Sequence, residues 1–274
     1  MPIIRRKPRT PSARFQSYIT SSDITRKKPE KRLVTGMRKS GGRNVYGRIT
    51  TRHRGGGARR KYRQIDFGRI ERDVRGKIAT IEYDPNRNVR IGLVVYENGA
   101  KHYMLLPEGL GVGSQVISGT EVEANVGNAL PIAKIPVGFQ MHNVEIRPGS
   151  RGTFARSAGT SVQLIDRDEE YAKLKMPSGE VRMVPVGCWA TVGVLGNADY
   201  KNISWGKAGR TRHRGFRPTV RGMVMNPVDH PHGGGEGRSK SGSHPRSPWG
   251  KGCKGTRTRT RKSALIIKRR GKKK

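Results

Sequence analysis

The chain has 274 residues, of which 57 are Lys or Arg and 20 are Asp or Glu, so its formal net charge at pH 7 is +37. Only 32% of the residues are hydrophobic, which is well below the share in an ordinary globular domain. These numbers exclude a protein that spreads both signs of charge over one surface, and they point to a polyanionic partner, most simply nucleic acid.

The positive charge is concentrated at the two ends of the sequence. Residues 1–80 hold 24 Lys and Arg against 5 Asp and Glu, and residues 201–274 hold 22 against 2. Residues 81–200 hold 11 against 13. Both ends are rich in Gly, Pro, Ser and Thr and have no sustained apolar period, so we expect them to be disordered alone and ordered on a partner.

In chain order, composition predicts a basic extension over residues 1–60 and a first strand-rich domain over 61–125. A second strand-rich domain follows over 126–199, and a Gly-, Arg- and Lys-rich extension covers 200–274. Strands are expected at 77–83, 90–96, 101–106, 115–118, 140–146, 160–165, 172–176, 181–184 and 189–195. Asn98-Gly99 is a strong hairpin signal. Short strands at this spacing predict a mainly β protein with small barrels and few, short helices.

The cysteines and apolar runs restrict the compartment. Cys188 and Cys253 have no CxxC spacing, which favours a reducing compartment over a disulfide scaffold, and Cys188 beside the apolar strand at 189–195 is expected in the core. No apolar run approaches the length of a membrane span, and the first residues lack the apolar segment of a secretory signal. We expect a cytoplasmic protein without a membrane partner, with an organellar transit peptide left open.

Within the extensions, Arg and Lys alternate with Gly, which lets backbone N–H groups approach phosphates closely. Five aromatic residues in or beside the extensions offer faces on which unpaired bases could stack: Tyr46, Tyr62, Trp205, Phe216 and Trp249. No helix-turn-helix, zinc-finger or zipper pattern is present, which favours RNA over DNA. The predicted RNA-binding residues are Arg43, Arg48, Arg52, His53, Arg54, Arg59, Arg60, Lys207, Arg210, Arg214, Arg217, Arg221, Asn226, Asp229, His230, His232 and Arg238.

Three interpretations compete for Asp229-His-Pro-His232 and the glycines that follow. Asp229 with a histidine could form an acid–base pair, but no nucleophile or substrate pocket accompanies it. The two histidines with His244 and Cys253 could bind zinc, although this spacing matches no compact finger. The favoured interpretation is a sharply turned Gly-rich loop packed against RNA. We therefore predict no enzymatic activity, no catalytic residue, no metal site and no cofactor, with any structural Mg²⁺ held mainly by rRNA.

Several segments resemble those of one family: Ser40–Asn44, Gly47–His53, Glu82–Arg87, Ile135–Gly138, His142–Glu145, Ala155–Thr160, Gly215–Gly222 and Asn226–Arg238 (NPVDHPHGGGEGR). The chain resembles the family of bacterial large-subunit ribosomal protein L-two over nearly its whole length. It departs from the family pattern mainly at residues 14–37 and in the last twenty residues, where only the basic character is carried over.

The resemblance implies an OB-like barrel over 61–125 and an SH3-like barrel over 126–199, with both extensions threading into large-subunit rRNA. It implies a primary rRNA-binding protein near the peptidyl-transferase region that also contacts other ribosomal proteins. It further implies a bridge to small-subunit rRNA and a role in subunit association and tRNA binding, while the peptide-bond chemistry belongs to RNA. A free-standing RNA-modifying or zinc-dependent enzyme and a DNA-packaging protein are the alternatives.

Overall fold

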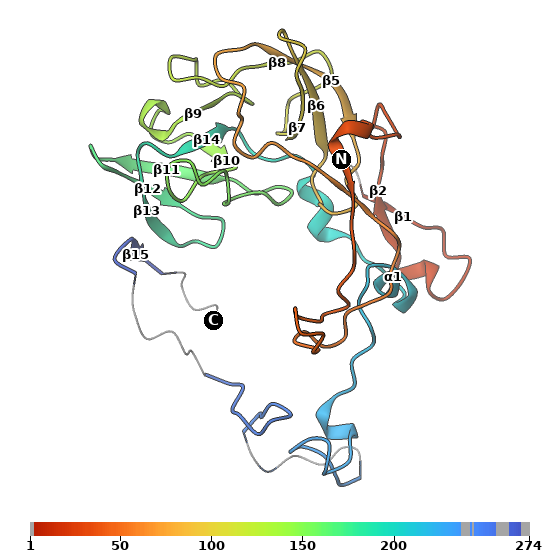
Figure 1. Cartoon of the computed structure of the whole chain (residues 1–274). Coiled ribbons are helices and arrows are strands. Elements are labelled where there is room, and N and C mark those ends of the chain that lie inside the picture. Colours follow the sequence, from red (N-terminus) through yellow and green to blue (C-terminus); the bar gives the residue numbers. More distant parts are fainter. Residues whose placement is uncertain (1–2, 237–241, 243, 256–262, 270–274) are drawn as a thin grey trace. The chain divides into compact units, whose positions relative to one another are not determined.

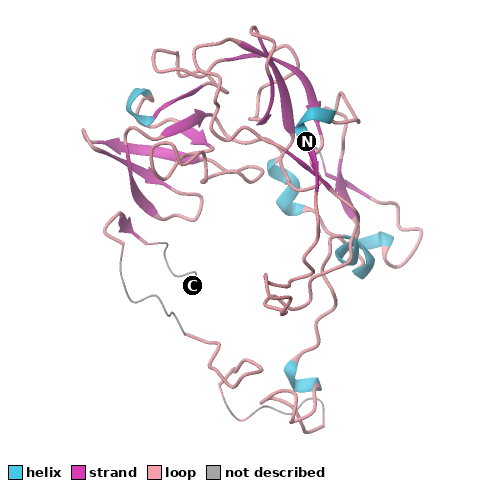
Figure 2. Ribbon diagram, in the orientation of Figure 1, coloured by secondary structure: helices cyan, strands magenta, loops and turns pink. Residues whose placement is uncertain are grey.

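The computed structural model describes residues 3–236, 242, 244–255 and 263–269, and these form two units. The first unit is built from the described residues up to 38, residues 59–208 and the described residues from 264 onward. The second unit is built from residues 39–58 and the described residues between 209 and 263. The strands all belong to the first unit, and loops make up most of the second (Figures 1 and 2).

The strands are β1 (Ile3–Arg5), β2 (Ser17–Ile19), β3 (Val34–Gly36), β4 (Lys61–Arg63), β5 (Gly76–Glu82), β6 (Ile91–Tyr96), β7 (Lys101–Leu105), β8 (Gln115–Val116), β9 (Ala129–Pro131), β10 (Gln140–His142), β11 (Val162–Arg167), β12 (Tyr171–Lys175), β13 (Val181–Pro185), β14 (Trp189–Val192) and β15 (Ile266–Lys268). The one described α-helix is α1 (Ala208–His213), and single 3-10 turns are η1 (Ala13–Phe15), η2 (Lys31–Leu33), η3 (Ile132–Lys134), η4 (Ala198–Asn202) and η5 (Gly222–Val224). No described helix is long and apolar enough to cross a membrane.

Two antiparallel sheets contain the main cores of the first unit. The four-stranded sheet has the order β7-β6-β5-β8, and the seven-stranded sheet has the order β15-β13-β12-β11-β10-β14-β9. Alternation along the strands produces this arrangement, because residues such as Ile78, Val94, Leu164 and Leu174 point inward and are fully buried. Each such side chain contributes about 1.5–3 kcal/mol through burial of apolar surface.

Two hairpin loops, one in each of the larger sheets, share one geometry. In the β6–β7 loop, Tyr96 N–H donates to Ala100 O at 2.9 Å and Gly99 N–H donates to Tyr96 O at 2.9 Å. The β12–β13 loop repeats both bonds, between Met176 and Glu180 and between Gly179 and Met176. In each five-residue segment, 96–100 and 176–180, the fourth residue is a glycine with a positive φ: Gly99 at +82° and Gly179 at +83°. Three-residue hairpin loops require such a residue at this position.

The segment before β5 ties the two sheets together. Phe67 O accepts hydrogen bonds from Gly152 N–H at 3.1 Å and from the Asn143 side chain at 3.0 Å. The Arg72 guanidinium lies 3.3 Å from the centroid of the Trp189 ring, and burial lowers the pKa of Arg72. These contacts position the four-stranded and seven-stranded sheets against each other.

The predicted mainly β fold, with few and short helices, is confirmed, and its curled antiparallel sheets agree with an OB-like barrel followed by an SH3-like barrel. Every strand expected from the sequence has a counterpart in β5–β8 or β10–β14. Cys188 lies in the core of the seven-stranded sheet as predicted, and burial raises the pKa of its thiol to about 12.

The sequence did not predict β1–β4, β9 or β15. Part of the N-terminal extension is in fact fixed to the four-stranded sheet, because Thr25 and Ile81 exchange hydrogen bonds and Arg90 pairs with Asp23 at 2.9 Å. The buried Tyr103 hydroxyl donates to Glu82 at 2.7 Å and accepts from Glu30 N–H at 2.8 Å. At the other end of the chain, β15 adds an edge strand to β13.

A buried histidine gives the first unit a pH-dependent stability. His142 is 1% exposed, its Nδ1 lies 2.9 Å from Gly193 O, and burial lowers its pKa to about 4. In the unfolded chain the same imidazole titrates near ~6.5, so the unfolded state binds the proton first as the pH falls. The stabilising contribution is therefore complete above pH ~6.5 and is lost as the pH falls toward about 4.

We expect the free energy of unfolding to fall by about 2 kcal/mol through His142 alone between pH 7 and pH 5. Urea unfolding at both pH values would measure this loss, and the His142→Gln variant, which cannot titrate, should lack this component. An NMR titration of the His142 ring gives its pKa in the folded protein directly. A ring that titrates near 6.5 would contradict the prediction.

Candidate nucleic-acid interface

In the second unit, residues 40–54 fold into a compact loop whose bonds include those of two glycines, Gly42 and Gly47. Thr50 and Thr51 both donate backbone N–H bonds to Gly42 O, at 2.9 and 3.1 Å. A Cβ on Gly42 would lie 2.1 Å from Thr51 O, and Gly42 has φ +80°, so the sequence needs glycine here. The tip of the loop repeats the hairpin geometry of the sheets, since Asn44 N–H donates to Arg48 O and Gly47 N–H donates to Asn44 O.

This loop pairs with a segment that lies more than 150 residues later in the sequence. Arg217 N–H donates to His53 O at 3.0 Å, Gly55 N–H to Gly215 O at 3.0 Å, and Ala58 N–H to His213 O at 2.9 Å. The Lys39 ammonium donates to three successive carbonyls, those of residues 56–58, at 2.8–2.9 Å. Residues 39–58 of the first basic extension thus fold together with part of the second.

A cavity of about 660 Å³ lies in this unit and is lined by Gly41, Arg43, Ile49, Thr50, Thr51, Arg52, His53, Arg54, Arg217 and Trp249. We call it the arginine pocket, and its four guanidinium residues (Arg43, Arg52, Arg54 and Arg217) the pocket arginines. All four are exposed, and no acidic residue lines the cavity. Its size lies within the range of known ligand sites, and its lining suits an anion.

Aromatic rings hold two of the pocket arginines in place. The Arg54 guanidinium lies 4.2 Å from the centroid of the Phe216 ring, and the Arg52 guanidinium lies 5.6 Å from that of Trp249. A guanidinium stacked on a ring loses little hydration and keeps its N–H donors free to point outward. Phe216 therefore supports an arginine in the protein itself, whereas the sequence suggested it as a stacking face for a base.

Charge in the second unit is almost entirely of one sign. Its described residues include thirteen Lys and Arg but only two acidic residues, Asp229 and Glu236. In the part of the chain that the structure describes, no acidic side chain forms an ion pair with a pocket arginine. In the first unit, by contrast, Lys134 pairs with Glu121 and Lys173 with Asp166. Concentrated positive charge of this kind attracts a phosphate backbone.

Two hairpin tips of the second unit carry exposed aromatic rings. Tyr46 is 87% exposed, and Trp249 is 75% exposed. Trp249 lies in a loop where Ser247 N–H donates to Lys251 O at 2.7 Å and Gly250 N–H donates to Ser247 O at 2.9 Å. In both tips the ring is followed by a glycine with positive φ and then by a cation. Such tips can present a ring to an unpaired base beside a phosphate-binding charge.

The histidines at 230 and 232 serve the backbone of their own loop. His230 is 8% exposed, and its Nδ1 accepts the His232 N–H at 3.0 Å. His232 Nε2 accepts the Arg246 N–H at 2.7 Å, and the two rings stack at 5.2 Å. Each bond requires an unprotonated ring nitrogen. The loop is tight, because a Cβ on Gly222 would lie 2.4 Å from the His230 ring.

The catalytic and metal alternatives find no support in this geometry. No hydrogen bond joins the Asp229 carboxylate to either imidazole in the described structure, and Asp229 is exposed. Among the residues that the structure describes, no three His, Cys, Asp or Glu side chains gather closely enough to hold a metal ion, so the zinc set suggested by the sequence is not assembled.

The structure brings most of the predicted RNA-binding residues into the second unit and leaves others elsewhere. The residues that it gathers there are Arg43, Arg48, Arg52, His53, Arg54, Arg210, Arg214, Arg217, Arg221, Asn226, Asp229, His230 and His232. Arg59, Arg60 and Lys207 belong to the first unit, and Arg238 lies outside the described residues. The prediction omitted the pocket residues Ile49, Thr50 and Thr51, which carry no charge to signal their role.

Two family models match the chain. The model described as Ribosomal Proteins L2, RNA binding N-terminal domain, matches residues 30–118. The model described as Ribosomal Proteins L2, C-terminal domain, matches residues 125–250. Together they cover most of the chain and include every predicted RNA-binding residue. The arginine pocket takes residues from both matched segments, since Arg43–Arg54 lie in the first, and Arg217 and Trp249 lie in the second.

Proposed function

Because the chain belongs to the ribosomal protein L2 family, and is thus a structural, RNA-binding constituent of the large ribosomal subunit, we propose that its second unit is a principal site for large-subunit rRNA. The observation that supports this most strongly is the arginine pocket, where four arginines and a tryptophan surround a cavity with no acidic lining. Guanidinium groups bind phosphate bidentately, and the ring of Trp249 offers a stacking face for a base.

The finer roles follow from the family and form the second part of the proposal. The chain binds rRNA near the peptidyl-transferase region, with its extensions (1–60 and 200–274) threaded into rRNA. It supports tRNA binding and subunit association through a bridge to small-subunit rRNA, alongside other ribosomal proteins in cytoplasmic ribosomes. Any Mg²⁺ at the contact is held mainly by rRNA phosphates.

On this proposal the histidine loop supports assembly, and peptide-bond chemistry is left to rRNA. The ring nitrogens of His230 and His232 that would act as bases already accept backbone N–H groups, and a general base needs such a lone pair for its substrate. These bonds instead fix the backbone at His232 and Arg246 in one arrangement, which a contact with folded RNA requires.

We predict that His232→Ala weakens retention of the chain in the large subunit more than it slows peptide-bond formation. The substitution removes the acceptor of Arg246 N–H and so loosens the loop. The test compares the amount of chain that remains after a high-salt wash with the single-turnover rate of peptidyl transfer in the subunits that keep it. His213→Ala, which removes an exposed histidine of the same unit, is the matched control. Normal retention with abolished peptide-bond formation would reverse the assignment.

A further inference from the structure

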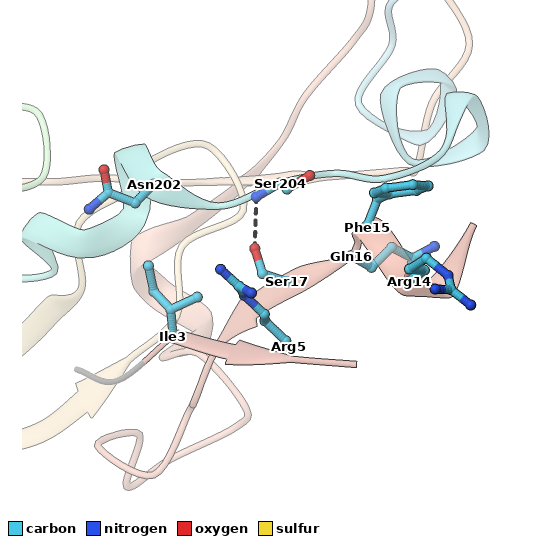
Figure 3. Close-up of a pocket in the computed structure, with 8 residues that line it drawn as sticks. All are labelled: Ile3, Arg5, Arg14, Phe15, Gln16, Ser17, Asn202 and Ser204. Carbon is cyan, nitrogen blue, oxygen red and sulfur yellow. Dashed lines mark hydrogen bonds between the residues drawn. The ribbon is translucent and has the colours of Figure 1, made fainter. Parts of the chain in front are cut away.

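A second cavity lies in the first unit, against the N-terminal hairpin. β1 pairs antiparallel with β2, so that Arg5 lies opposite Ser17. The 3-10 helix η1 belongs to the loop that connects these two strands. The cavity has a volume of about 610 Å³ and is lined by Ile3, Arg5, Arg14, Phe15, Gln16, Ser17, Asn202 and Ser204 (Figure 3). Its size is again that of a small-ligand site.

The hairpin holds this cavity open by binding to the segment after η4. Ser17 N–H donates to Ser204 O at 3.0 Å, and Ser204 N–H donates to Ser17 Oγ at 2.7 Å, the bond drawn in Figure 3. Gln16 and Ser17 are 4% and 6% exposed. Gly206 allows this close approach, because a Cβ there would lie 2.4 Å from the Gln16 side chain and 2.9 Å from its backbone nitrogen. The cavity wall is therefore preformed.

The lining has the chemistry of a nucleotide site. Arg5 and Arg14 are exposed, and no acidic residue lines the cavity or pairs with them in the described structure. The Phe15 ring is 65% exposed at the same cavity. Guanidinium groups next to an uncovered aromatic face can bind a phosphate and stack the base attached to it. The exposed side chains of Asn202 and Ser204 add hydrogen-bonding groups for the sugar.

We propose that this cavity binds an unpaired nucleotide of large-subunit rRNA, with Arg5 and Arg14 on its phosphate and Phe15 against its base. The inference rests on the proposed function and adds a second RNA site, distinct from the arginine pocket. Six of the eight lining residues precede residue 30, where the match to the N-terminal family model begins. The hairpin thus extends RNA binding beyond the segment that the family models describe.

The test measures binding of the full chain to a large-subunit rRNA fragment at several salt concentrations. Arg5→Ala/Arg14→Ala removes both cavity charges, and Arg6→Ala/Arg9→Ala removes two exposed charges from the same segment that do not line the cavity. The first variant should lower the salt slope by about 1.4, at about 0.7 per contact with single-stranded RNA, and the second should lower it by clearly less. Equal slopes for both variants would overturn the proposal. If the unmodified chain itself bound no rRNA, the proposed function would fail instead.

The base contact has its own variant. Phe15→Ala should weaken rRNA binding about tenfold through the lost stacking, whereas Tyr18→Ala removes a ring of the same hairpin that lies outside the cavity and should change binding less than twofold. UV irradiation of the complex should attach a nucleotide to the peptide that contains Phe15. Equal effects of the two substitutions, without this crosslink, would remove Phe15 from the site.

Discussion

Replacing all four pocket arginines by alanine is expected to lower the affinity for large-subunit rRNA by roughly two to three orders of magnitude at 0.15 M salt. Each arginine that contacts a phosphate releases counterions, so four lost contacts should reduce the salt slope by about 3. The pocket has no acidic lining, so no ion pair within it is broken, and the loss should appear in binding far more than in folding. Nitrocellulose filter binding over a range of salt concentrations measures both quantities.

The matched control removes four exposed charges from the first unit: Lys77, Lys101, Arg147 and Lys175. It changes the net charge equally, so any general attraction between the chain and RNA falls by a similar amount. We expect this variant to keep most of the salt slope. Identical slopes in the two variants would mean that RNA binding follows the total charge, and the arginine pocket would then have no special role.

Gly57→Ala is expected to separate the two segments that form the second unit, whereas Gly56→Ala is expected to be tolerated. Both glycines have a positive φ, at +78° and +63°, so alanine costs about 1–2 kcal/mol at either position. Around Gly56 there is open space for a Cβ, but a Cβ on Gly57 would lie 2.7 Å from Gly215 N and 2.8 Å from His213 O. Only Gly57→Ala forces the backbones of the two segments apart.

Hydrogen exchange provides the measurement. The amides of Gly55 and Ala58 donate to Gly215 O and His213 O, so their protection should be lost in Gly57→Ala and largely kept in Gly56→Ala. The rRNA affinity should fall with the protection, because the pocket takes residues from both segments. Equal exchange rates in the two variants would show that the left-handed conformation, and not the close approach, determines the pairing.

Alternation in the sequence was sufficient to predict most strands of the two larger sheets. Residues 77–83 and 90–96 alternate or run apolar between clear turn signals, and β5 and β6 lie there. The strands that were missed are each three residues long. They form through partners elsewhere in the sequence, as β15 does with β13. Three residues carry too little periodicity to distinguish a strand from a loop.

The candidate site was predictable in its chemistry but not in its assembly. The excess of Arg and the interleaved glycines identify residues 43–54 and 210–221 as RNA-binding candidates, but nothing in either segment indicates that it pairs with the other. One signal was available: Ser247-Pro-Trp-Gly-Lys251 has the same Pro and Gly positions as Met176-Pro-Ser-Gly-Glu180. That similarity predicts a hairpin with Trp249 at its tip, which the structure contains.

On the proposed function, rRNA binds the second unit at the arginine pocket. The most direct test is UV crosslinking of isolated large subunits, followed by mass spectrometry of the peptide–nucleotide adducts of this chain. We predict crosslinks at Trp249 and within residues 43–54 and 214–221, and few on the exposed residues of β11–β13. Crosslinks concentrated on β11–β13, with none in the segments around the pocket, would contradict the account.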